Sequence, residues 1–440
     1  MEKINVYIET YGCQMNVYDT ELVGGILTED GSYTITESPD DADVILLNTC
    51  SVRENAEKTI YNRLMHLKHY RKSNPDLAVG IIGCMAERLR KDIFEKSDLV
   101  KIVMGPDEYR KAPELIRSSL DGENGIAVKL SRVETYEDIE PLRTKGVSAW
   151  LAIMRGCNHF CTYCVVPFTR GRERSRSVDS IIKEVQNLVE QGFKEVTLLG
   201  QNVNSYNDLN SRTDFPNLLR AVAKAAPTMR IRYLTSHPID MSDDLIYAMS
   251  EYDNICNYIH LPFQSGSDKI LQLMNRQYSR EHYLERISKI KEVIPDCSLS
   301  TDIIAGFPTE TLDDHLDTLS LMSEVEFDGA FMFKYSPREG TKAWNMDDNI
   351  TEEEKLERLN EIISFQNKIS YKKNQAEIGK VYEILVEGES KKNPQEWMGR
   401  TKTNKVVVFD NSIENAQAGT LLNVKIESAN SATLFGNIVY

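Results

Sequence analysis

The sequence predicts an α/β protein in three parts: two domains built on parallel sheets, followed by a small antiparallel β-barrel. The parallel sheets are indicated by strand-like apolar runs that alternate with helical patterns over residues 1–120 and again over 147–372. The barrel is indicated by residues 375–440, which contain short runs rich in β-branched residues and no helical period. A chain of 440 residues is long enough for about three domains.

The first domain is expected over residues 1–120. Its strand-like runs are Ile4–Ile8, Val44–Leu47, Val79–Ile82 and Ile102–Met104. Helical patterns between them include Asp19–Leu27 and Ala56–Tyr70. Such alternation implies a parallel sheet with helices on both faces.

Three of these strands end in a cysteine, in the segments Tyr11-Gly12-Cys13, Asn48-Thr49-Cys50 and Ile82-Gly83-Cys84. Because the carboxyl ends of parallel strands meet at one edge of the sheet, we expect Cys13, Cys50 and Cys84 to converge. Three thiolates can hold three irons of an iron–sulfur cluster and leave the fourth iron open. The alternative is plain burial, since cysteine is common in α/β cores.

Residues 121–146 are predicted to form a polar connector without a catalytic motif. Asp121–Gly125 is rich in turn-forming residues, and the acidic stretch Glu134–Glu140 is followed by Pro141.

The second domain is expected over 147–372 as a partial (β/α)6 barrel. Its predicted strands are Ala149–Met154, Glu195–Leu199, Arg230–Leu234, Tyr258–Leu261, Ser300–Ile304 and Gly329–Tyr335. Helical stretches include Ser180–Gln191, Asp243–Glu251, Arg280–Val293 and Leu312–Val325. In such barrels the active site gathers at the carboxyl ends of the strands.

A C-x3-C-x2-C motif follows the first of these strands directly, with Cys157, Cys161 and Cys164 on one short loop. Three thiolates at this spacing can grip three irons of a cubane cluster and leave the fourth open for chemistry. The alternative is a structural zinc site, which needs four closed ligands and would take His159 as the fourth.

The last domain is expected over 375–440. Its short strands are Val381–Glu387, Lys405–Phe409, Leu422–Glu427 and Ala432–Val439, separated by Gly and Asn turns. Small barrels of this kind often bind RNA.

Composition narrows the class of protein. No signal peptide and no apolar run of roughly 18 residues is present, so we expect no membrane partner and a cytoplasmic location. Eight cysteines without an export signal indicate reduced thiols and metal ligation. The net charge of −15 disfavours nucleic acid overall, although a local basic patch can act alone.

The motifs resemble those of the radical S-adenosylmethionine (SAM) methylthiotransferases over the whole chain. C-x3-C-x2-C is the hallmark of radical SAM enzymes, and Cys13, Cys50 and Cys84 with a terminal barrel are similar to the methylthiotransferase pattern. Further segments resemble the branch that makes 2-methylthio-N6-isopentenyladenosine in tRNA: Tyr11–Asn16, Met154–Cys157, Cys164–Glu173, Thr235–Pro238, His260–Pro262, Gln264–Ser267, Gly399–Thr401 and Asn404-Lys405.

The resemblance implies an N-terminal cluster domain, a radical SAM barrel and a C-terminal TRAM domain. It also implies two 4Fe-4S clusters and two molecules of SAM per reaction. The loop cysteines would hold the cluster that cleaves SAM to a 5′-deoxyadenosyl radical, and the strand-end cysteines would hold the cluster that carries sulfur. The implied activity is methylthiolation of C2 of N6-isopentenyladenosine at position 37 of tRNA.

Further residues are expected to contact SAM: Gln201 and Asn202 after the second barrel strand, Ser236, Asp302 and Gly306. A plain turn is the alternative for Gln201-Asn202 and for Gly306. Arg170, Arg172, Arg174 and Arg176 leave the cluster loop directly and are expected to bind RNA phosphates, the alternative being a solvated face. Lys391, Lys392 and the segment 402–405 are either RNA contacts or ordinary surface charge.

The implied partners are a tRNA anticodon stem-loop carrying isopentenyladenosine, an electron donor such as a flavodoxin or ferredoxin, and an iron–sulfur or sulfur carrier. Two sister branches remain as alternatives, one acting on threonylcarbamoyladenosine in tRNA and one on an aspartate of a ribosomal protein. A different class, a non-catalytic zinc-bearing RNA-binding protein, is the other alternative.

Overall fold

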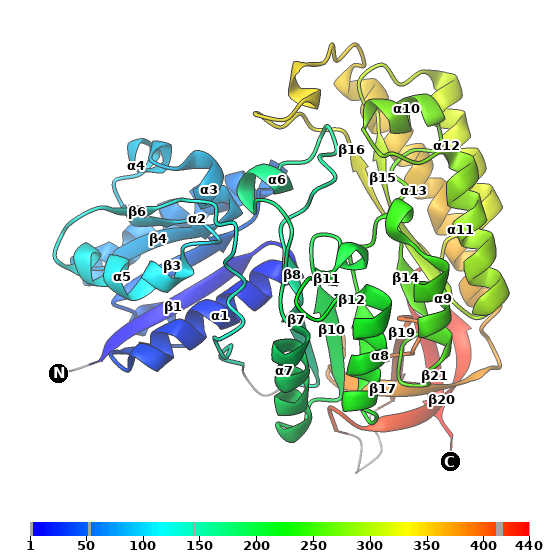
Figure 1. The fold of residues 1–440 in the computed structure, drawn as a ribbon, viewed down its shortest axis with the longest axis horizontal. Helices are drawn as coiled ribbons and strands as arrows, with labels where there is room; N and C mark the ends of the chain where they lie inside the picture. Colours follow the sequence, from blue (N-terminus) through cyan, green and yellow to red (C-terminus); the bar gives the residue numbers. More distant parts are fainter. Residues whose placement is uncertain (1–2, 52–53, 144–145, 411–416, 440) are drawn as a thin grey trace.

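The computed structural model describes residues 3–51, 54–143, 146–410 and 417–439. Three bodies follow one another along the chain: an α/β domain, a half-open barrel of parallel strands, and a small closed barrel packed beneath it (Figure 1). This order agrees with the three parts predicted from the sequence.

The first domain is one parallel sheet with strand order β2-β1-β3-β4-β5-β6. The strands are β1 (Ile4–Tyr11), β2 (Tyr33–Ile35), β3 (Val44–Thr49), β4 (Ala78–Gly83), β5 (Val100–Met104) and β6 (Gly125–Ala127). The helices are α1 (Gln14–Asp30), α2 (Glu54–Ser73), α3 (Cys84–Leu89), α4 (Asp92–Lys96) and α5 (Ala112–Leu120). Both β3 and β4 are buried throughout, as expected for central strands covered on two faces.

The predicted connector, 121–146, contains an element that the sequence did not indicate. Gly125–Ala127 forms β6 and pairs with β5 at the edge of the first sheet. The Gly-rich polar composition concealed this strand, because only three residues take part.

The second domain consists of two three-stranded parallel sheets. One has the order β13-β10-β7 and the other β14-β15-β16, and the bridge between Ile231 and Ile255 joins them. The six strands are β7 (Ser148–Ala152), β10 (Glu195–Leu199), β13 (Arg230–Tyr233), β14 (Tyr258–His260), β15 (Ser298–Ala305) and β16 (Gly329–Lys334). Short pairs add β8 (Met154–Arg155) with β9 (Arg174–Ser175), and β11 (Asn207–Asp208) with β12 (Thr213–Asp214).

Helices on the outside of this partial barrel close its core. They are α7 (Val178–Glu190), α8 (Phe215–Ala225), α9 (Asp243–Ser250), α10 (Asp268–Leu273), α11 (Arg280–Val293), α12 (Leu312–Val325) and α13 (Glu352–Gln375), whereas the short helix α6 (Val166–Thr169) contacts α3 of the first domain. One continuous apolar core lies between the strands and these helices. Helix α13 packs against β15 and β16 and leads to the last domain.

The last domain is a closed five-stranded barrel of order β17-β18-β19-β21-β20. Its strands are β17 (Val381–Glu389), β18 (Glu396–Arg400), β19 (Val406–Asp410), β20 (Leu421–Ala429) and β21 (Leu434–Ile438). The sequence predicted four of them and missed β18, which contains Gly399 and has no β-branched residue. Four pairings are antiparallel, and the parallel pairing of β19 with β21 closes the barrel.

Within the described ranges, none of the helices has the length and hydropathy that a membrane crossing requires.

Candidate active site

The first cysteine set lies at the carboxyl edge of the N-terminal sheet, as the sequence predicted. In the strand register, Thr49 is the partner of both Tyr11 and Gly83, so the residues that follow these three positions leave the sheet side by side. A Cβ on Gly12 would lie 2.8 Å from the Cβ of Cys50, which shows how closely the Cys13 segment approaches. Cys50 and Cys84 are buried, and Cys13 is half-buried.

A buried arginine sits among these thiols. Arg170 donates from Nε to the Sγ of Cys84 at 3.2 Å. A hydrogen bond with Cys50, and then the charge of Arg170, lowers the pKa of Cys13 to about 6 against the opposing effect of burial. Burial raises the pKa of the Cys84 thiol, and Arg170 opposes that rise. The Nη1 of Arg170 is buried and has no hydrogen-bond partner among the described residues. Three converging thiols beside a cation with spare donor capacity fit a cluster held by thiolates.

The second cysteine set lies on the loop that follows β7 and β8. Gly156 begins this loop at φ +80°, and a Cβ there would lie 2.0 Å from the carbonyl oxygen of Arg172, so only glycine fits. The N–H of Cys157 donates to Gly171 O at 3.1 Å, which folds the loop back on itself. Burial raises the pKa of Cys157 to about 11 and that of Cys164 to about 12.

Arg276 donates a hydrogen bond to a thiol of this loop, as Arg170 does to a thiol of the first set. It is buried, and its Nη1 donates to the Sγ of Cys161 at 3.4 Å. The same guanidinium donates from Nη2 to Pro262 O at 3.0 Å and from Nε to the hydroxyl of Tyr278 at 3.2 Å. Sequence reasoning missed Arg276, because it lies 115 residues after Cys161 and outside any motif.

A buried carboxylate joins the two domains at this place. Asp19 of α1 accepts from Arg155 and from Arg170, each at 2.7 Å, and it also accepts from the hydroxyl of Tyr109 at 3.2 Å. Although burial opposes ionisation, the two guanidinium groups hold the pKa of Asp19 below its ordinary value. The ring of Tyr136 lies 4.7 Å from the guanidinium carbon of Arg155.

An apolar cluster brings Cys13 to the inner face of the barrel. Met15 and Tyr18 of α1 pack with Ala152 of β7 and Leu199 of β10, and Cys13, Trp150 and Leu234 pack around them. Helix α3, which begins at Cys84, and helix α6, which follows Cys164, also contact each other across the boundary. The structure thus brings both cysteine sets to the junction between the first domain and the carboxyl ends of the barrel strands.

Two predicted SAM contacts carry buried atoms with spare hydrogen-bonding capacity. The Oδ1 of Asn202 and the Oγ of Ser236 are buried and find no partner within the described part of the chain. Asn202 is held through its Nδ2, which donates to Asp240 Oδ2 at 2.7 Å. Gln201 accepts the N–H of Gly156 and so also fixes the cysteine loop. Unsatisfied polar atoms of this kind fit a polar ligand.

The other two predicted contacts have partners of their own. Asp302 lies 3.4 Å from the Nε2 of His260. Gly306 has φ +71°, and a Cβ there would lie 2.4 Å from the Cγ of Lys355. Its N–H donates to Glu310 Oε1 at 3.0 Å. Packing against Lys355 already requires glycine at 306, and contact with SAM stays a prediction for both residues.

His159, His237 and Asp240 also cluster beside Asn202, with ligand atoms within 4.8 Å of one another. The two imidazole rings stack with centroids 3.8 Å apart and planes 5° apart. Because the nitrogen lone pairs lie in the ring planes, two parallel rings cannot both point at one metal ion. His159 Nε2 instead lies 2.7 Å from Asp240 Oδ2 and 2.9 Å from Asn202 Nδ2. That nitrogen is therefore engaged by Asp240 and Asn202.

The arginine stretch predicted to bind RNA is largely internal. Arg170 pairs with Asp19, Arg174 with Asp107 at 2.8 Å, and Arg176 with Glu184 at 2.6 Å, and all three arginines are buried. Arg172 is exposed and lies over the ring of Phe160 at 4.3 Å. Of the carboxylates that engage three of the four, Asp19 and Asp107 are 151 and 67 residues away, and Glu184 is 8 residues away. RNA contact by this stretch stays a prediction, and Arg172 is the exposed member that could make it.

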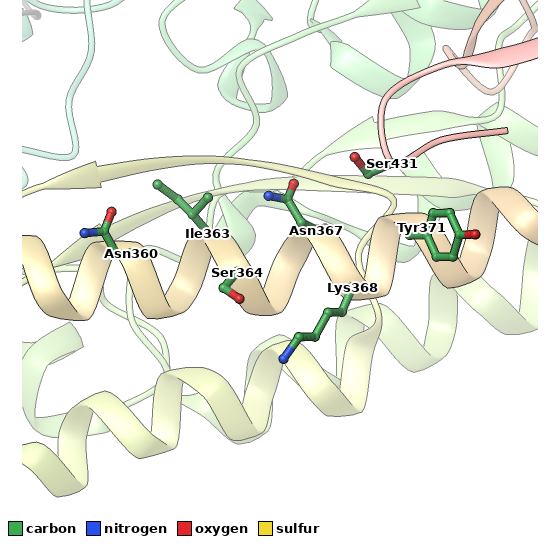
Figure 2. Close-up of a pocket in the computed structure, with 7 residues that line it drawn as sticks. All are labelled: Asn360, Ile363, Ser364, Asn367, Lys368, Tyr371 and Ser431. Carbon is green, nitrogen blue, oxygen red and sulfur yellow. The ribbon is translucent and has the colours of Figure 1, made fainter.

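The hollow along α13 in Figure 2 is distinct from this site. It is lined by Asn360, Ile363, Ser364, Asn367, Lys368, Tyr371 and Ser431, and none of these offers a thiol, an imidazole or a carboxylate.

Comparisons with known proteins agree with the three-part architecture. Residues 151–322 match the radical SAM superfamily, residues 375–439 match the TRAM domain, and residues 5–105 match a family described as uncharacterized protein family UPF0004. A tRNA-2-methylthio-N(6)-dimethylallyladenosine synthase of Chloroherpeton thalassium is 53% identical over 437 residues, which cover 99% of this chain and 96% of that protein. The protein of the same name from Parabacteroides distasonis is 52% identical over 439 residues, covering 99% and 95%.

Solved structures share the fold at low identity. The radical SAM methyltransferase TsrM of Kitasatospora setae, with cobalamin and a [4Fe-4S] cluster bound, has a TM-score of 0.56 at 13% identity and covers 76% of this chain and 75% of its own. The cobalamin-dependent radical SAM enzyme OxsB has a TM-score of 0.52 at 13% identity, covering 83% and 56%.

Proposed function

Because the chain belongs to the tRNA-2-methylthio-N(6)-dimethylallyladenosine synthases of the radical SAM superfamily, we propose that it replaces the C2 hydrogen of N6-isopentenyladenosine at position 37 of tRNA with a methylthio group. The observation that carries this proposal is the pair of cysteine sets brought to one junction, in a chain about half identical to those synthases along its length.

The chemistry requires a cofactor, since the C2–H of adenine is neither acidic nor electrophilic. Two 4Fe-4S clusters and two molecules of SAM, when bound, supply the radical and the methylated sulfur that this carbon needs. In our proposal Cys157, Cys161 and Cys164 hold one cluster, and Cys13, Cys50 and Cys84 hold the other. Asn202 and Ser236, with their spare buried oxygens, are the best-supported contacts for SAM.

The residues around the thiols favour metal binding by the thiols. Arg170 and Arg276 each donate to one thiol of a set, which favours the thiolate that a cluster requires. Burial of Cys50 and Cys84 keeps water away from reactive sulfur. The packing of Cys13 against the cluster that contains Ala152 and Leu199 directs the sulfur-bearing set toward the barrel interior, where a base that has left its stack can enter.

We assign RNA contact to the TRAM barrel and to the exposed Arg172, with an anticodon stem-loop as the partner. An electron donor such as a flavodoxin or ferredoxin, and an iron–sulfur or sulfur carrier, complete the proposed cycle. A tRNA-modifying enzyme of this kind acts in the cytoplasm.

The test is mass spectrometry of nucleosides from isopentenylated tRNA, after anaerobic incubation with reconstituted protein, SAM and a reductant. A methylthio adduct on isopentenyladenosine is the expected product. If SAM is cleaved and that nucleoside stays unchanged, the substrate is that of a sister branch. Zinc without iron in the purified protein would contradict the enzymatic assignment.

A further inference from the structure

Two phenylalanines of β16 are unusually exposed for the last strand of a barrel. Phe331 is 56% exposed and Phe333 is 42% exposed. Their neighbours Ala330 and Met332 point the other way and pack against the barrel core. Lys334, also on that other face, pairs with Glu352 of α13. The two aromatic rings therefore stand on the face of β16 that α13 does not cover.

The strand register identifies that face as the inside of the barrel. Phe331 is the partner of Asp302 on β15, and Phe333 is the partner of Ile304. Residues opposite each other in adjacent strands point to the same side of a sheet. Leu299 and Ile303 of β15 belong to the outer core, so Asp302 and Ile304 point inward, and both phenylalanines do so with them.

The same inner row leads to the cysteine loop. Below Phe331, the imidazole of His260 meets its ring edge-on with centroids 5.7 Å apart, and His260 Nδ1 lies 2.8 Å from Ser300 Oγ. Beyond Phe333, Tyr335 packs with Phe307 in a cluster that includes Ile304 and Tyr163, the residue before Cys164. A group that lies on the two phenylalanines is thus inside the barrel, between His260 and the loop cysteines.

The two halves of the barrel differ in the chemistry they offer. The unsatisfied polar atoms of Asn202 and Ser236 follow β10 and β13, in the half that also carries the cysteine loop. The exposed aromatic pair is on β16, in the other half. A polar cofactor fits the first half, and an apolar group fits the second.

We propose that Phe331 and Phe333 form the pocket for the isopentenyl group on N6 of the substrate adenine, a deepening that rests on the proposed function. A branched five-carbon chain gains affinity by covering two exposed rings, since apolar surface leaves water. This pocket places Asp302, the register partner of Phe331, beside the substrate and not beside SAM. Its carboxylate disfavours the alternatives, because threonylcarbamoyladenosine and an aspartate side chain both bring a carboxylate next to it. The pocket therefore selects an apolar substituent by attraction and rejects an acidic one by repulsion.

The experiment compares anticodon stem-loop RNAs with isopentenyladenosine, threonylcarbamoyladenosine or unmodified adenosine, bound to the reconstituted full-length protein under anaerobic conditions. Fluorescence anisotropy gives the affinities. Replacing both rings, Phe331→Ala with Phe333→Ala, is expected to lower the affinity for isopentenylated RNA about 30-fold and to leave that for unmodified RNA unchanged. Replacing both by leucine is expected to keep most of the preference. Tyr371→Ala, an equally exposed aromatic on α13, is the matched control and is expected to change neither affinity.

Three results for the alanine double variant would overturn the pocket assignment. The variant keeps the preference for isopentenylated RNA, or its binding to all RNAs weakens equally. In the third, it loses affinity for SAM and still discriminates between the RNAs. Circular dichroism of the variants establishes that they are folded. The proposed function is judged separately on the wild-type protein. If the wild type methylthiolates isopentenyladenosine and the double variant still discriminates, the pocket assignment alone fails. If the wild type modifies no isopentenylated tRNA, both assignments fail.

Discussion

The guanidinium Nε of Arg170 lies 3.2 Å from the Sγ of Cys84, although 86 residues separate them in the chain. Arg170 follows the cysteine loop of the barrel, and Cys84 opens α3 of the N-terminal domain. The same arginine reaches Asp19 of α1. One side chain of the barrel thus contributes to the charge environment of the thiols in the other domain, so the site of one cysteine set depends on how the domains pack.

Arg170→Met is expected to reduce iron binding by the N-terminal set. The variant removes the donor to Cys84 and one of the two cations that pair with Asp19, so a buried charge loses part of its compensation at a cost of about 3 kcal/mol. Iron content is best measured with Cys157, Cys161 and Cys164 all replaced by alanine, because the remaining iron then reports the N-terminal set.

Arg172→Met is the matched control for this experiment, since Arg172 belongs to the same stretch and is exposed. Its iron content and urea-unfolding midpoint should equal those of the parent protein. Equal iron in the Arg170 and Arg172 variants would contradict the role given to the hydrogen bond.

The two cysteine sets are expected to fail in different ways. Cys157→Ala should abolish SAM cleavage, because this thiol belongs to the loop set. Cys50→Ala should spare SAM cleavage and abolish methylthio transfer. Both are read out by chromatography of 5′-deoxyadenosine and of the tRNA nucleosides. Methylthio transfer by Cys50→Ala would refute the division of labour between the sets, and Cys256→Ala, a buried cysteine outside both, should leave both products unchanged.

The buried carboxyl of Glu87 makes the stability of the N-terminal domain depend on pH. Burial raises the pKa of Glu87 from 4.5 to about 7, and its Oε2 has no hydrogen-bond partner among the described residues. The folded state therefore holds a proton that the unfolded state releases. The resulting stabilisation, about 3 kcal/mol, is fully present below pH 4.5 and is lost as the pH rises through about 7.

Urea unfolding between pH 4.5 and pH 8, followed by hydrogen exchange of β4 and α3, measures this effect. Glu87→Gln should flatten the pH dependence over that window. Glu95→Gln, at an exposed position of α4, should leave it as in the wild type. A pH profile that is the same for Glu87→Gln and the wild type would exclude Glu87 as the titrating group.

Arg232 of β13 is expected to hold the TRAM barrel in place. Its guanidinium is buried and donates to Thr401 O at 2.7 Å, to Lys402 O at 2.9 Å and to Glu195 at 2.8 Å. Arg232→Met removes these three hydrogen bonds and leaves the buried carboxylate of Glu195 without its cation, at about 3–5 kcal/mol. Limited proteolysis should then release a fragment spanning 375–439 faster.

Arg220→Met tests whether any lost ion pair has this effect, because Arg220 pairs with the exposed carboxylates of Asp244 and Glu251 on the barrel surface. Exposed pairs contribute at most about 1 kcal/mol, so the rate of release should not change. Equal rates for Arg232→Met and the wild type would show that other contacts fix the barrel.

The sequence by itself determined the three-part architecture and the convergence of Cys13, Cys50 and Cys84. Strands, helices and a C-x3-C-x2-C loop are local patterns, and the topology of parallel sheets then requires that strand ends meet at one edge. Their ligand roles stay predictions, but their positions follow from short-range information. The missed strands β2, β6 and β18 show the limit of that information, since a strand of three residues, or one with Gly399, leaves too weak a period to detect.

The tertiary structure alone decided which charged and aromatic side chains serve the site. Arg170, Arg174 and Arg176 have the composition of a surface patch, yet each is buried against a carboxylate between 8 and 151 residues away. Phe331 and Phe333 have the composition of a core strand, yet only the register with β15 and the packing of α13 show that they face inward and stay exposed. The physical reason is that burial and charge pairing depend on partners distant in the sequence, which become neighbours only when the domains pack.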